Sequence, residues 1–398
     1  MGNLIYKNFP TVEVTFSLTN RTKSVRLADV IDEEELRAEL DEVRNLCYGR
    51  EEIAFLWSQR SHKGQILGDE YLAFLENEFE LPPYELDVID GQFDLRFTGP
   101  WPSVSHWEIY ALPIINELYF RSLEQKESSL AGLSNFGYGI EQLRKKVQLL
   151  KEHPDVIFSD FGTRRRYSRA WHKLVVRILA EELSPKQFLG TSNVALAMEL
   201  GLLATGTSAH ELPMVIGALF RGTEAPFISQ NRVLHHWWNE YGFGLSIALT
   251  DTLGTSYFLK HMPLEMVLRW KGFRQDSGDP ISFGERIITY YKFIGVEPRN
   301  KVIIFSDGLD IEAMLRIANH FKGCIRTTFG WGTNLTNDRA RKALSLVIKA
   351  VSVRRGDVLT GTVKLSDNLE KAMGELEDIA YYKKECGYEE TFSEECRY

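Results

Sequence analysis

The chain has 398 residues, 44% of them hydrophobic, which is enough for two domains with one large core and one smaller core. Its formal net charge of −8 provides no basic field that would attract nucleic acid or an anionic membrane surface. The four cysteines are scattered without C-x-x-C spacing, which argues against a zinc site and a disulfide framework. No apolar run reaches the roughly 20 residues of a membrane span, and no signal pattern opens the chain. We therefore expect a cytoplasmic protein that acts on small molecules.

The first part of the chain mixes strand and helix patterns. Residues 12–18 alternate as a strand does, and residues 33–46 have helical spacing with acidic residues in the first turn. A further strand is predicted at residues 95–97. Residues 107–120 then begin a long apolar helix, despite Pro113. The sequence predicts an α/β domain whose N-terminal part covers residues 1–122.

From Val156 onward, short apolar runs alternate with amphipathic helices such as residues 168–182 and 311–321. This alternation predicts a parallel sheet. Each apolar run ends in Asp, Gly, Thr or Asn, and barrel enzymes carry their working residues at such strand ends. An irregular or incomplete (β/α) barrel over residues 123–343 is therefore favoured over an open doubly wound sheet. Strand-like runs reappear after Arg341, so residues 344–398 are expected to return to the N-terminal domain.

Residues 190–211 contain two Gly-Thr turns that flank a short helix, and the second turn ends in a histidine. Thr191 and Ser192 belong to the first turn, and Thr207 belongs to the second. Each turn opens a helix, where free N–H groups and hydroxyls form an anion site. Taken singly, each turn is more often an N-cap, and a lone histidine is more often a core residue. The position of His210 beside the turn makes a catalytic role about as plausible as a structural one.

Two further clusters combine charges near predicted strand ends. Phe161 precedes three adjacent arginines that begin at Arg164, and such a run can grip phosphate or carboxylate. A solvated helix start is the alternative, although cations are unfavourable there because of the helix dipole. Arg274 and Asp276 stand directly before a Ser-Gly-Asp-Pro turn. A tight turn explains Ser-Gly-Asp-Pro but does not explain the two charged residues before it.

Single polar residues at other strand ends complete the set. Asp251 and Asp307 each follow an apolar run and suit ribose hydroxyls or a magnesium ion. Gly330, Gly332 and Thr333 form a glycine-rich turn that could bring backbone N–H groups close to a phosphate. The turn matches neither the Walker motif nor the dinucleotide fingerprint. Together the clusters indicate phosphoryl or phosphoribosyl chemistry.

Six motifs resemble those of the nicotinate phosphoribosyltransferase family, in the family's order: FGTRRR, GTSN, GTSAHE, RQDSGDP, FSDGLD and FGWGTNLTND. The resemblance extends to VEVTFSLTNRT near the N-terminus and to SLVIKA and KLSDN near the C-terminus. It implies the type II phosphoribosyltransferase fold, an irregular, incomplete (β/α) barrel with an α/β sandwich-like domain built from both chain ends.

The activity that the resemblance implies is an ATP-coupled reaction of NAD salvage, classed as a ligase. Nicotinate and 5-phosphoribosyl 1-diphosphate would give nicotinate mononucleotide and pyrophosphate, while ATP is hydrolysed to ADP and phosphate. ATP would phosphorylate His210, and a neutral imidazole is a competent nucleophile near pH 7. ATP is thus implied as co-substrate, and Mg²⁺ as a further cofactor.

Site roles follow from the same resemblance, residue by residue. The catalytic set is His210, Asp276 and Arg274, with Arg274 also holding the nicotinate carboxylate or a nearby phosphate. Phe161 and Arg164 would form part of the pyridine pocket. The other expected substrate contacts are Thr191, Ser192, Thr207, Asp251, Asp307, Gly330, Gly332 and Thr333. Asp251 and Asp307 are also the magnesium candidates.

The family also carries a D-x-Y-K segment just before the position that matches Met1. Its tyrosine is expected to reach the active site of the partner subunit in a homodimer with shared sites. We therefore expect that the printed chain starts at an internal methionine or lacks its terminus. Three alternatives stay open: an enzyme for nicotinamide or quinolinate, a catalytically silent relative that binds phosphoribosyl diphosphate, and a purely structural α/β protein. Arg165 and Arg166 favour nicotinate.

Overall fold

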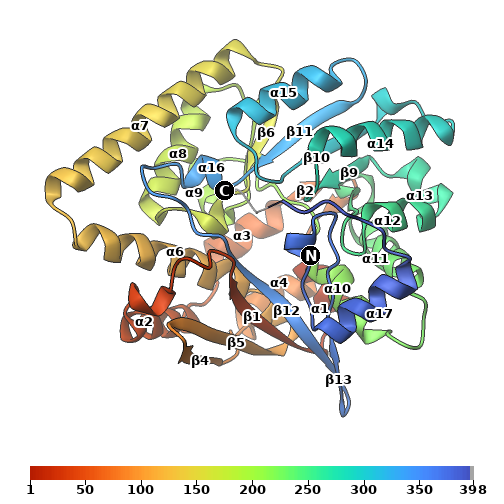
Figure 1. Cartoon of the computed structure of the whole chain (residues 1–398), viewed down its shortest axis with the longest axis horizontal. Helices are drawn as coiled ribbons and strands as arrows, with labels where there is room; N and C mark the ends of the chain where they lie inside the picture. Colours follow the sequence, from red (N-terminus) through yellow and green to blue (C-terminus); the bar gives the residue numbers. More distant parts are fainter. Residues whose placement is uncertain (395–398) are drawn as a thin grey trace.

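A computed structural model of the protein describes residues 1–394. Two large sheets form its framework, and helices cover them (Figure 1). Within residues 1–394, none of the helices is both long enough and apolar enough to cross a bilayer. The mixed α/β fold expected from the sequence is confirmed.

The first sheet is antiparallel and contains strands from both ends of the chain, in the order β13-β12-β1-β5-β4. β1 (Glu13–Asn20) pairs on one side with β12 (Leu346–Arg355) and on the other with β5 (Gln92–Pro100). β4 (Tyr84–Ile89) and β13 (Val358–Gly361) form the two edges. Every second residue of β1 is buried, as its alternating sequence predicts.

Helices of the N-terminal part pack around this sheet. α2 (Glu33–Arg44) starts at Asp32, whose carboxylate caps the helix by accepting from the Glu35 N–H. The predicted apolar helix is α6 (Trp107–Gln125), which continues through Pro113. The remaining elements of this part are α1 (Gly2–Asn8), α3 (Arg50–Ser58), β2 (Arg60–Ser61), β3 (Gly64–Gln65), α4 (Asp69–Asn77) and α5 (Trp101–Val104).

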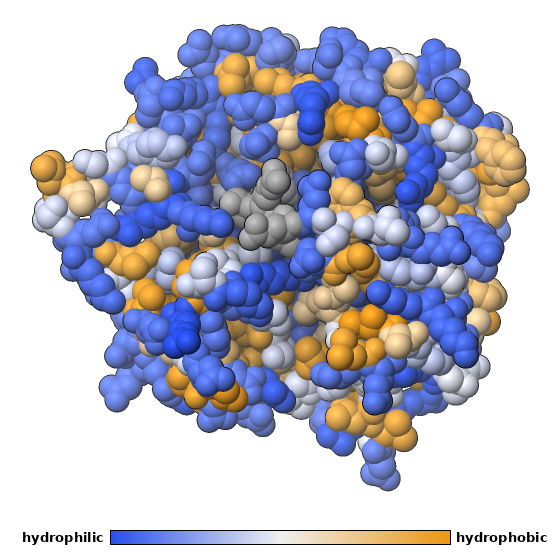
Figure 2. Space-filling model, in the orientation of Figure 1, coloured by the Kyte–Doolittle hydropathy of each residue, from blue (hydrophilic) through white to orange (hydrophobic). Residues whose placement is uncertain are grey.

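α7 (Ser129–Glu152) leads from the first sheet to the second and stands out from the body of the molecule (Figure 1). Its first turns carry Leu130 and Leu133, which are 74% and 68% exposed. Figure 2 shows apolar residues at this protruding end, on a face that is otherwise mainly hydrophilic.

The second sheet has six parallel strands in the order β7-β6-β11-β10-β9-β8. In residues 1–394 no strand pairing joins β7 to β8, so the sheet keeps two edges. The parallel arrangement agrees with the predicted β/α alternation, while full barrel geometry stays a prediction. The strands are β6 (Phe158–Asp160), β7 (Phe188–Thr191), β8 (Ile247–Leu249), β9 (Gly272–Gln275), β10 (Val302–Phe305) and β11 (Arg326–Trp331).

Helices connect these strands, and two of them, α8 (Arg169–Glu182) and α15 (Ile311–Phe321), agree with the predicted ranges. α8 begins after Ser168, whose hydroxyl accepts from the Trp171 N–H. α15 has the predicted bounds. The other helices are α9 (Val194–Leu200), α10 (Glu211–Leu219), α11 (Pro226–Tyr241), α12 (Thr255–His261), α13 (Leu264–Arg269), α14 (Pro280–Phe293), α16 (Thr333–Thr336) and α17 (Leu376–Cys386).

The core consists of one large cluster and one small cluster. The large cluster runs through both sheets, and the small one joins Tyr257 to four residues of the C-terminal segment: Val363, Leu365, Tyr382 and Cys386. Both α6 and α10 contact β12. The start of α10, where His210 lies, is thereby held at the junction of the two sheets.

Candidate active site

A polar cavity of about 170 Å³ lies where the carboxyl ends of the parallel strands face the first sheet. Seven basic and three acidic side chains line it, although the chain as a whole is acidic. Such a surplus of cations suits anionic ligands. The basic residues are Arg21, Arg164, Arg165, Arg274, Lys349, Lys364 and Lys371, and the acidic residues are Glu108, Asp276 and Asp307.

His210 is the N-cap residue of α10 and is 4% exposed. Its Nδ1 lies 2.8 Å from the hydroxyl of Thr252, and its Nε2 lies 3.0 Å from Oδ2 of Asp276. Burial lowers the pKa of His210 to about 4, and Lys364 adds to this effect. The hydrogen-bond partners indicate a neutral imidazole that donates from Nε2 and accepts at Nδ1.

Two carboxylates face this imidazole. Oδ1 of Asp251 lies 3.3 Å from His210 Nε2, and Oδ2 of Asp251 lies 3.2 Å from the ammonium of Lys364. Burial would raise the pKa of Asp276, but Arg274 and the imidazole outweigh it and hold that pKa well below its usual range. Both carboxylates are therefore ionised beside a neutral histidine.

Arg274, on β9, connects the second Gly-Thr turn to this group. Its Nη1 donates to the Thr207 hydroxyl and, at 2.9 Å, to the Ser208 carbonyl, while Nη2 donates to Asp276 at 3.0 Å. The residues that directly follow the paired strands β9 and β10 add a further bond, because the Ser306 hydroxyl donates to Asp276 at 3.0 Å. Asp276 is thus fixed by three elements of the fold.

A second charged cluster joins the first sheet to the arginine run. Oε1 of Glu108, on α6, accepts from Arg164 and from Lys349, both at 2.6 Å. Burial would raise the pKa of Glu108, but Lys349 and Arg164 outweigh it and lower the pKa. Arg165 shares the short helical turn η2 (Thr163–Arg165) with Arg164 and also lines the cavity.

Lys371, from the C-terminal segment, also lines the cavity. Lys371 donates to Asp307 and, at 3.0 Å, to the Asp276 carbonyl. Burial raises the pKa of Asp307, although Lys371 opposes this. The Asp307 side chain is therefore engaged by the protein's own cation.

The glycine-rich turn after β11 approaches Phe161 closely. A Cβ on Gly330 would lie 2.4 Å from the Phe161 ring, so only glycine fits there without displacing the ring. Gly330, Gly332, Thr333 and Phe161 all line the cavity. The turn presents backbone to the cavity beside an aromatic face.

The first Gly-Thr turn has a different environment. Thr191 is fully buried, and its hydroxyl donates to Asp160 at 2.5 Å. Asp160 also accepts from Nε2 of His172 at 2.7 Å and from the Gly162 N–H. The Ser192 N–H donates to the Asp160 carbonyl at 2.8 Å. This turn supports the strand ends from behind the cavity wall.

The structure brings most of the predicted site residues to the cavity. Those that line it are Phe161, Arg164, His210, Arg274, Asp276, Asp307, Gly330, Gly332 and Thr333. Asp251 and Thr207 lie just behind this wall, in contact with His210 and Arg274 respectively. Thr191 and Ser192 are not among the lining residues.

Sequence reasoning gave no role to several residues that line the cavity. Arg21, Lys349 and Lys364 lie inside stretches that carry the family resemblance, so the motifs contained the signal. Glu108 is an isolated carboxylate in an apolar helix, which was the only local sign of its burial. Ser306 lies in the FSDGLD motif, whereas nothing local distinguished Lys371.

One group of side chains has the composition of a cation site. Ligand atoms of His210, Asp251 and Asp276 lie within 4.8 Å of one another. Oδ1 of Asp251 is buried and makes no hydrogen bond within residues 1–394. Mg²⁺ typically binds one or two carboxylates together with substrate phosphates, so Asp251 and Asp276 fit that ion. Asp307 is not part of this group and forms an ion pair with Lys371.

The chain matches two sequence patterns of one family. The nicotinate phosphoribosyltransferase (NAPRTase) family pattern matches residues 156–391, and the NAPRTase N-terminal domain matches residues 1–116.

Solved structures agree with this match. The chain is similar to nicotinate phosphoribosyltransferase from Porphyromonas gingivalis, with a TM-score of 0.86 and 31% identity over 97% of this chain and 96% of that one. A putative nicotinate phosphoribosyltransferase from Saccharomyces cerevisiae has a TM-score of 0.86 and 27% identity, over 98% of this chain and 95% of that one. Nicotinate phosphoribosyltransferase from Vibrio cholerae has a TM-score of 0.83 and 28% identity, over 98% of this chain and 91% of that one. The chain therefore belongs to the nicotinate phosphoribosyltransferase family.

Proposed function

We propose that the protein joins nicotinate to 5-phosphoribosyl 1-diphosphate, giving nicotinate mononucleotide and pyrophosphate in NAD salvage, with ATP hydrolysed to ADP and phosphate. The observation that carries this proposal is the cationic cavity that contains the buried pair of His210 and Asp276. Both substrates are anions, and the cavity has more than twice as many basic as acidic side chains.

The transfer step breaks the bond between the anomeric carbon and pyrophosphate and forms a bond from that carbon to the pyridine nitrogen. Positive charge develops on the ribose, and negative charge develops on the leaving pyrophosphate. Fixed cations such as Lys364 and Lys371 would stabilise the pyrophosphate without reorganising, because both are buried and already held in place. Mg²⁺ on Asp251 and Asp276 would neutralise part of the same charge.

The nicotinate ring would lie against Phe161, near Arg164 and Arg274. The guanidinium groups would pair with its carboxylate, and the backbone of Gly330 and Gly332 would approach the ribose phosphate. Holding both reactants in this orientation lowers the entropy cost of the transfer.

His210 would accept the γ-phosphoryl group of ATP. The P–O bond to ADP breaks as the N–P bond forms, and the imidazole proton passes to a facing carboxylate, Asp276 or Asp251. The lowered pKa of His210 supports this role, because the imidazole stays neutral, and therefore nucleophilic, at neutral pH. Phosphate on His210 would add negative charge beside the cations that hold pyrophosphate.

Turnover on three bases tests the proposal. The protein is incubated with phosphoribosyl diphosphate, Mg²⁺ and nicotinate, nicotinamide or quinolinate, with and without ATP, and mononucleotides and ADP are measured by mass spectrometry. Nicotinate is expected to react fastest, and ATP is expected to stimulate it. Faster turnover of nicotinamide would assign the alternative base, and binding without pyrophosphate release would indicate a silent relative.

A homodimer with shared active sites is also part of the proposal. The exposed Leu130 and Leu133 at the protruding end of α7 support it, since a second copy would cover this apolar surface. Light scattering would test it. We expect Leu133→Asp to give monomers, whereas Leu376→Asp, at a leucine that is 84% exposed on α17, should leave dimers intact.

A further inference from the structure

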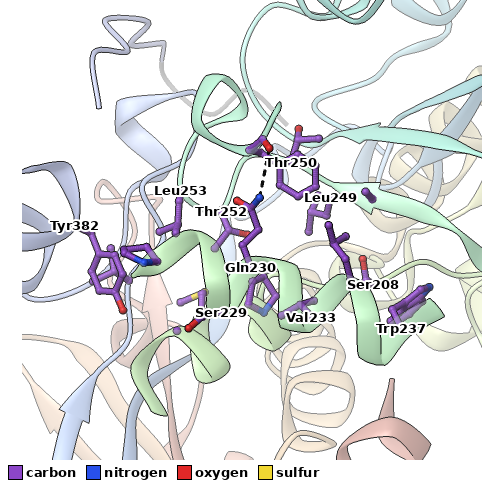
Figure 3. A pocket seen from close by; sticks show the side chains of 18 of the residues that line it. Ser208, Ser229, Gln230, Val233, Trp237, Leu249, Thr250, Thr252, Leu253 and Tyr382 are labelled. Atoms are coloured by element: carbon purple, nitrogen blue, oxygen red, sulfur yellow. Dashed lines mark hydrogen bonds between the residues drawn. The ribbon is translucent and has the colours of Figure 1, made fainter. Parts of the chain in front are cut away.

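Behind the wall of the active-site cavity, the interior is apolar in one place and charged in another. Between α10, α11 and β8 lies an apolar pocket of about 40 Å³, and the described residues that line it include no charged side chain (Figure 3). Between β6 and α8, in contrast, lie the carboxylate of Asp160 and the imidazole of His172, and neither residue has any exposed surface. The proposed mechanism uses neither group. Such groups are costly to bury, so the fold must gain something from their hydrogen bonds.

Asp160, the last residue of β6, accepts three hydrogen bonds through its carboxylate. Oδ2 accepts from Nε2 of His172 at 2.7 Å and from the Thr191 hydroxyl at 2.5 Å, and Oδ1 accepts from the Gly162 N–H at 2.7 Å. Burial would raise the pKa of Asp160, but His172 and these hydrogen bonds outweigh it and lower that pKa. The carboxylate is therefore ionised, and because it can only accept, His172 carries a proton on Nε2.

The bond between Asp160 and His172 closes a loop at its base. The two residues are 12 positions apart, and the chain between them, which we call the arginine loop, contains Phe161, the turn η2 and the start of α8. Phe161, Arg164 and Arg165 of this loop line the cavity. Closing a loop removes many of the conformations that it could otherwise adopt. The buried pair therefore restricts the segment that carries three side chains of the cavity.

Other bonds hold the arginine loop to the segment that follows β11. The Gly162 carbonyl accepts from the Thr336 hydroxyl at 3.0 Å, and the Arg165 carbonyl accepts from the Asn337 amide at 2.8 Å. A Cβ on Gly162 would lie 2.2 Å from Oγ1 of Thr336, so the two segments pack closely. Loss of the buried pair should therefore loosen the loop without unfolding it.

The other ring nitrogen of His172 makes this residue unfavourable for packing alone. Nδ1 is buried and has no hydrogen-bond partner within residues 1–394. An unpaired buried polar atom costs free energy, and an apolar side chain at this position would avoid that cost. Residues that break a local rule in this way are expected where function needs them. What His172 provides in return is its bond to Asp160.

We infer that Asp160 and His172 are positioning residues, which close the arginine loop and thereby set the affinity of the cavity for its aromatic carboxylate substrate. The inference rests on the proposed function, in which Phe161 and Arg164 contact nicotinate. Neither member of the pair lines the cavity, so both act through the loop between them.

Hydrogen exchange measured by mass spectrometry tests loop closure without any turnover. In His172→Leu, the amides of residues 161–166 should exchange about tenfold faster than in the unmodified chain, because the loop opens more often. His172→Gln keeps a donor near the position of Nε2 and should restore slow exchange. Val175→Ala is the matched control, because it removes buried apolar packing from the same helix and leaves the pair intact.

Asp160→Asn gives a second variant, so the test stands even where His172→Leu does not fold. Its amide replaces one acceptor oxygen by a donor among three other donors, and exchange of the same amides should again be faster. Unchanged exchange in both variants, or equally fast exchange in Val175→Ala, overturns the positioning role.

Steady-state kinetics tests the consequence for the substrate. In His172→Leu the KM for nicotinate should rise about tenfold and the KM for phosphoribosyl diphosphate should stay within about twofold, whereas a general loss of structure would lower turnover without this selectivity. His172→Gln should recover most of the affinity for nicotinate. Faster exchange with an unchanged KM for nicotinate overturns the link to substrate binding. Faster exchange in His172→Leu, when the unmodified chain does not use nicotinate, supports loop closure and contradicts the proposed function alone.

Discussion

Nε2 of His210 lies 3.0 Å from Oδ2 of Asp276, so a buried neutral base and an ionised carboxylate share one hydrogen bond at the wall of the cavity. The carboxylate keeps its charge because Arg274 donates to its other oxygen. This arrangement gives the imidazole a proton acceptor while its own lowered pKa keeps it uncharged.

Replacing His210 with alanine is expected to remove ATP-stimulated turnover and leave a slower, ATP-independent reaction. Phosphate should be found on His210 of the unmodified protein by mass spectrometry after incubation with ATP. His235→Ala is the matched control, because His235 is an exposed histidine on α11 and should respond to ATP normally. An unchanged ATP response in His210→Ala contradicts the assignment.

The lowered pKa of His210 also predicts how stability depends on pH. Its pKa falls from an ordinary 6.5 to about 4 in the folded chain, so between these values the unfolded state binds more protons. Stability is lost as pH decreases through this window, on the order of 3 kcal/mol from this group. In His210→Gln the loss should be smaller by that amount, as measured by urea unfolding at pH 4 to 7. Parallel curves for the two proteins would contradict this.

The buried carboxyl group of Glu211 should make stability depend on pH in the opposite direction. Burial, with Glu108 nearby, raises its pKa from 4.5 to about 8, and its Oε1 accepts from the Trp101 indole at 2.5 Å. The folded chain holds a proton that the unfolded chain releases, so stability decreases as pH rises from 4.5 to 8. Glu211→Gln keeps the acceptor oxygen without the proton. It should remove this part of the decrease in thermal unfolding experiments, and an unaltered pH dependence would refute the assignment.

Glu108→Gln should destabilise the fold, since it leaves Lys349 and Arg164 without their shared carboxylate. Removing one member of a buried ion pair typically costs about 3 to 5 kcal/mol. Lys349 is largely buried, whereas Arg164 is 46% exposed, so we expect about 3 kcal/mol. Glu265→Gln is the control, because Glu265 and its partner Arg269 are 68% and 57% exposed, so its loss should cost below about 1 kcal/mol. Equal losses of unfolding free energy in the two variants, measured by denaturant unfolding, would show that the buried ion pairs of Glu108 do not stabilise the fold.

Gly330→Ala is expected to raise the KM for nicotinate about tenfold, a loss of about 1.4 kcal/mol of binding. The new Cβ would lie 2.4 Å from Phe161 and displace its ring from the cavity. Gly49→Ala, at the start of α3, introduces a Cβ that meets only Glu52 at an ordinary 3.5 Å and should leave kinetics unchanged. A normal KM in Gly330→Ala would show that the Phe161 ring does not contact the base.

Local patterns predicted the elements well and the site in part. The bounds of α15 and the strand pattern of β1 follow from spacing alone, because a 3.6-residue or two-residue period reports which face is buried. Strand-end position likewise predicted Arg274 and Asp276, since the carboxyl ends of parallel strands meet at one edge. His210 was predicted instead from its place beside a Gly-Thr turn and from the family resemblance.

The remaining residues could not be predicted from local sequence, because long-range packing sets their roles. Glu108 and Lys349 are 241 positions apart, and only the pairing of α6 with β12 brings them together. Thr191 shows the converse: its turn matches an anion site, but burial directs its hydroxyl to Asp160. Local sequence cannot distinguish these two outcomes.

The interleaved first sheet has a consequence for synthesis. β1 is synthesised near the start of translation, yet one of its edges can pair only after β12 (Leu346–Arg355) has left the ribosome. An unpaired edge is a template for pairing with other chains, so the nascent protein carries an aggregation risk during nearly all of its translation. Lys349, Lys364 and Lys371 emerge in the same late segment. The cavity is therefore completed only at the end of synthesis, and a chain truncated before β12 lacks two of the five strands of the first sheet as well as these three lysines.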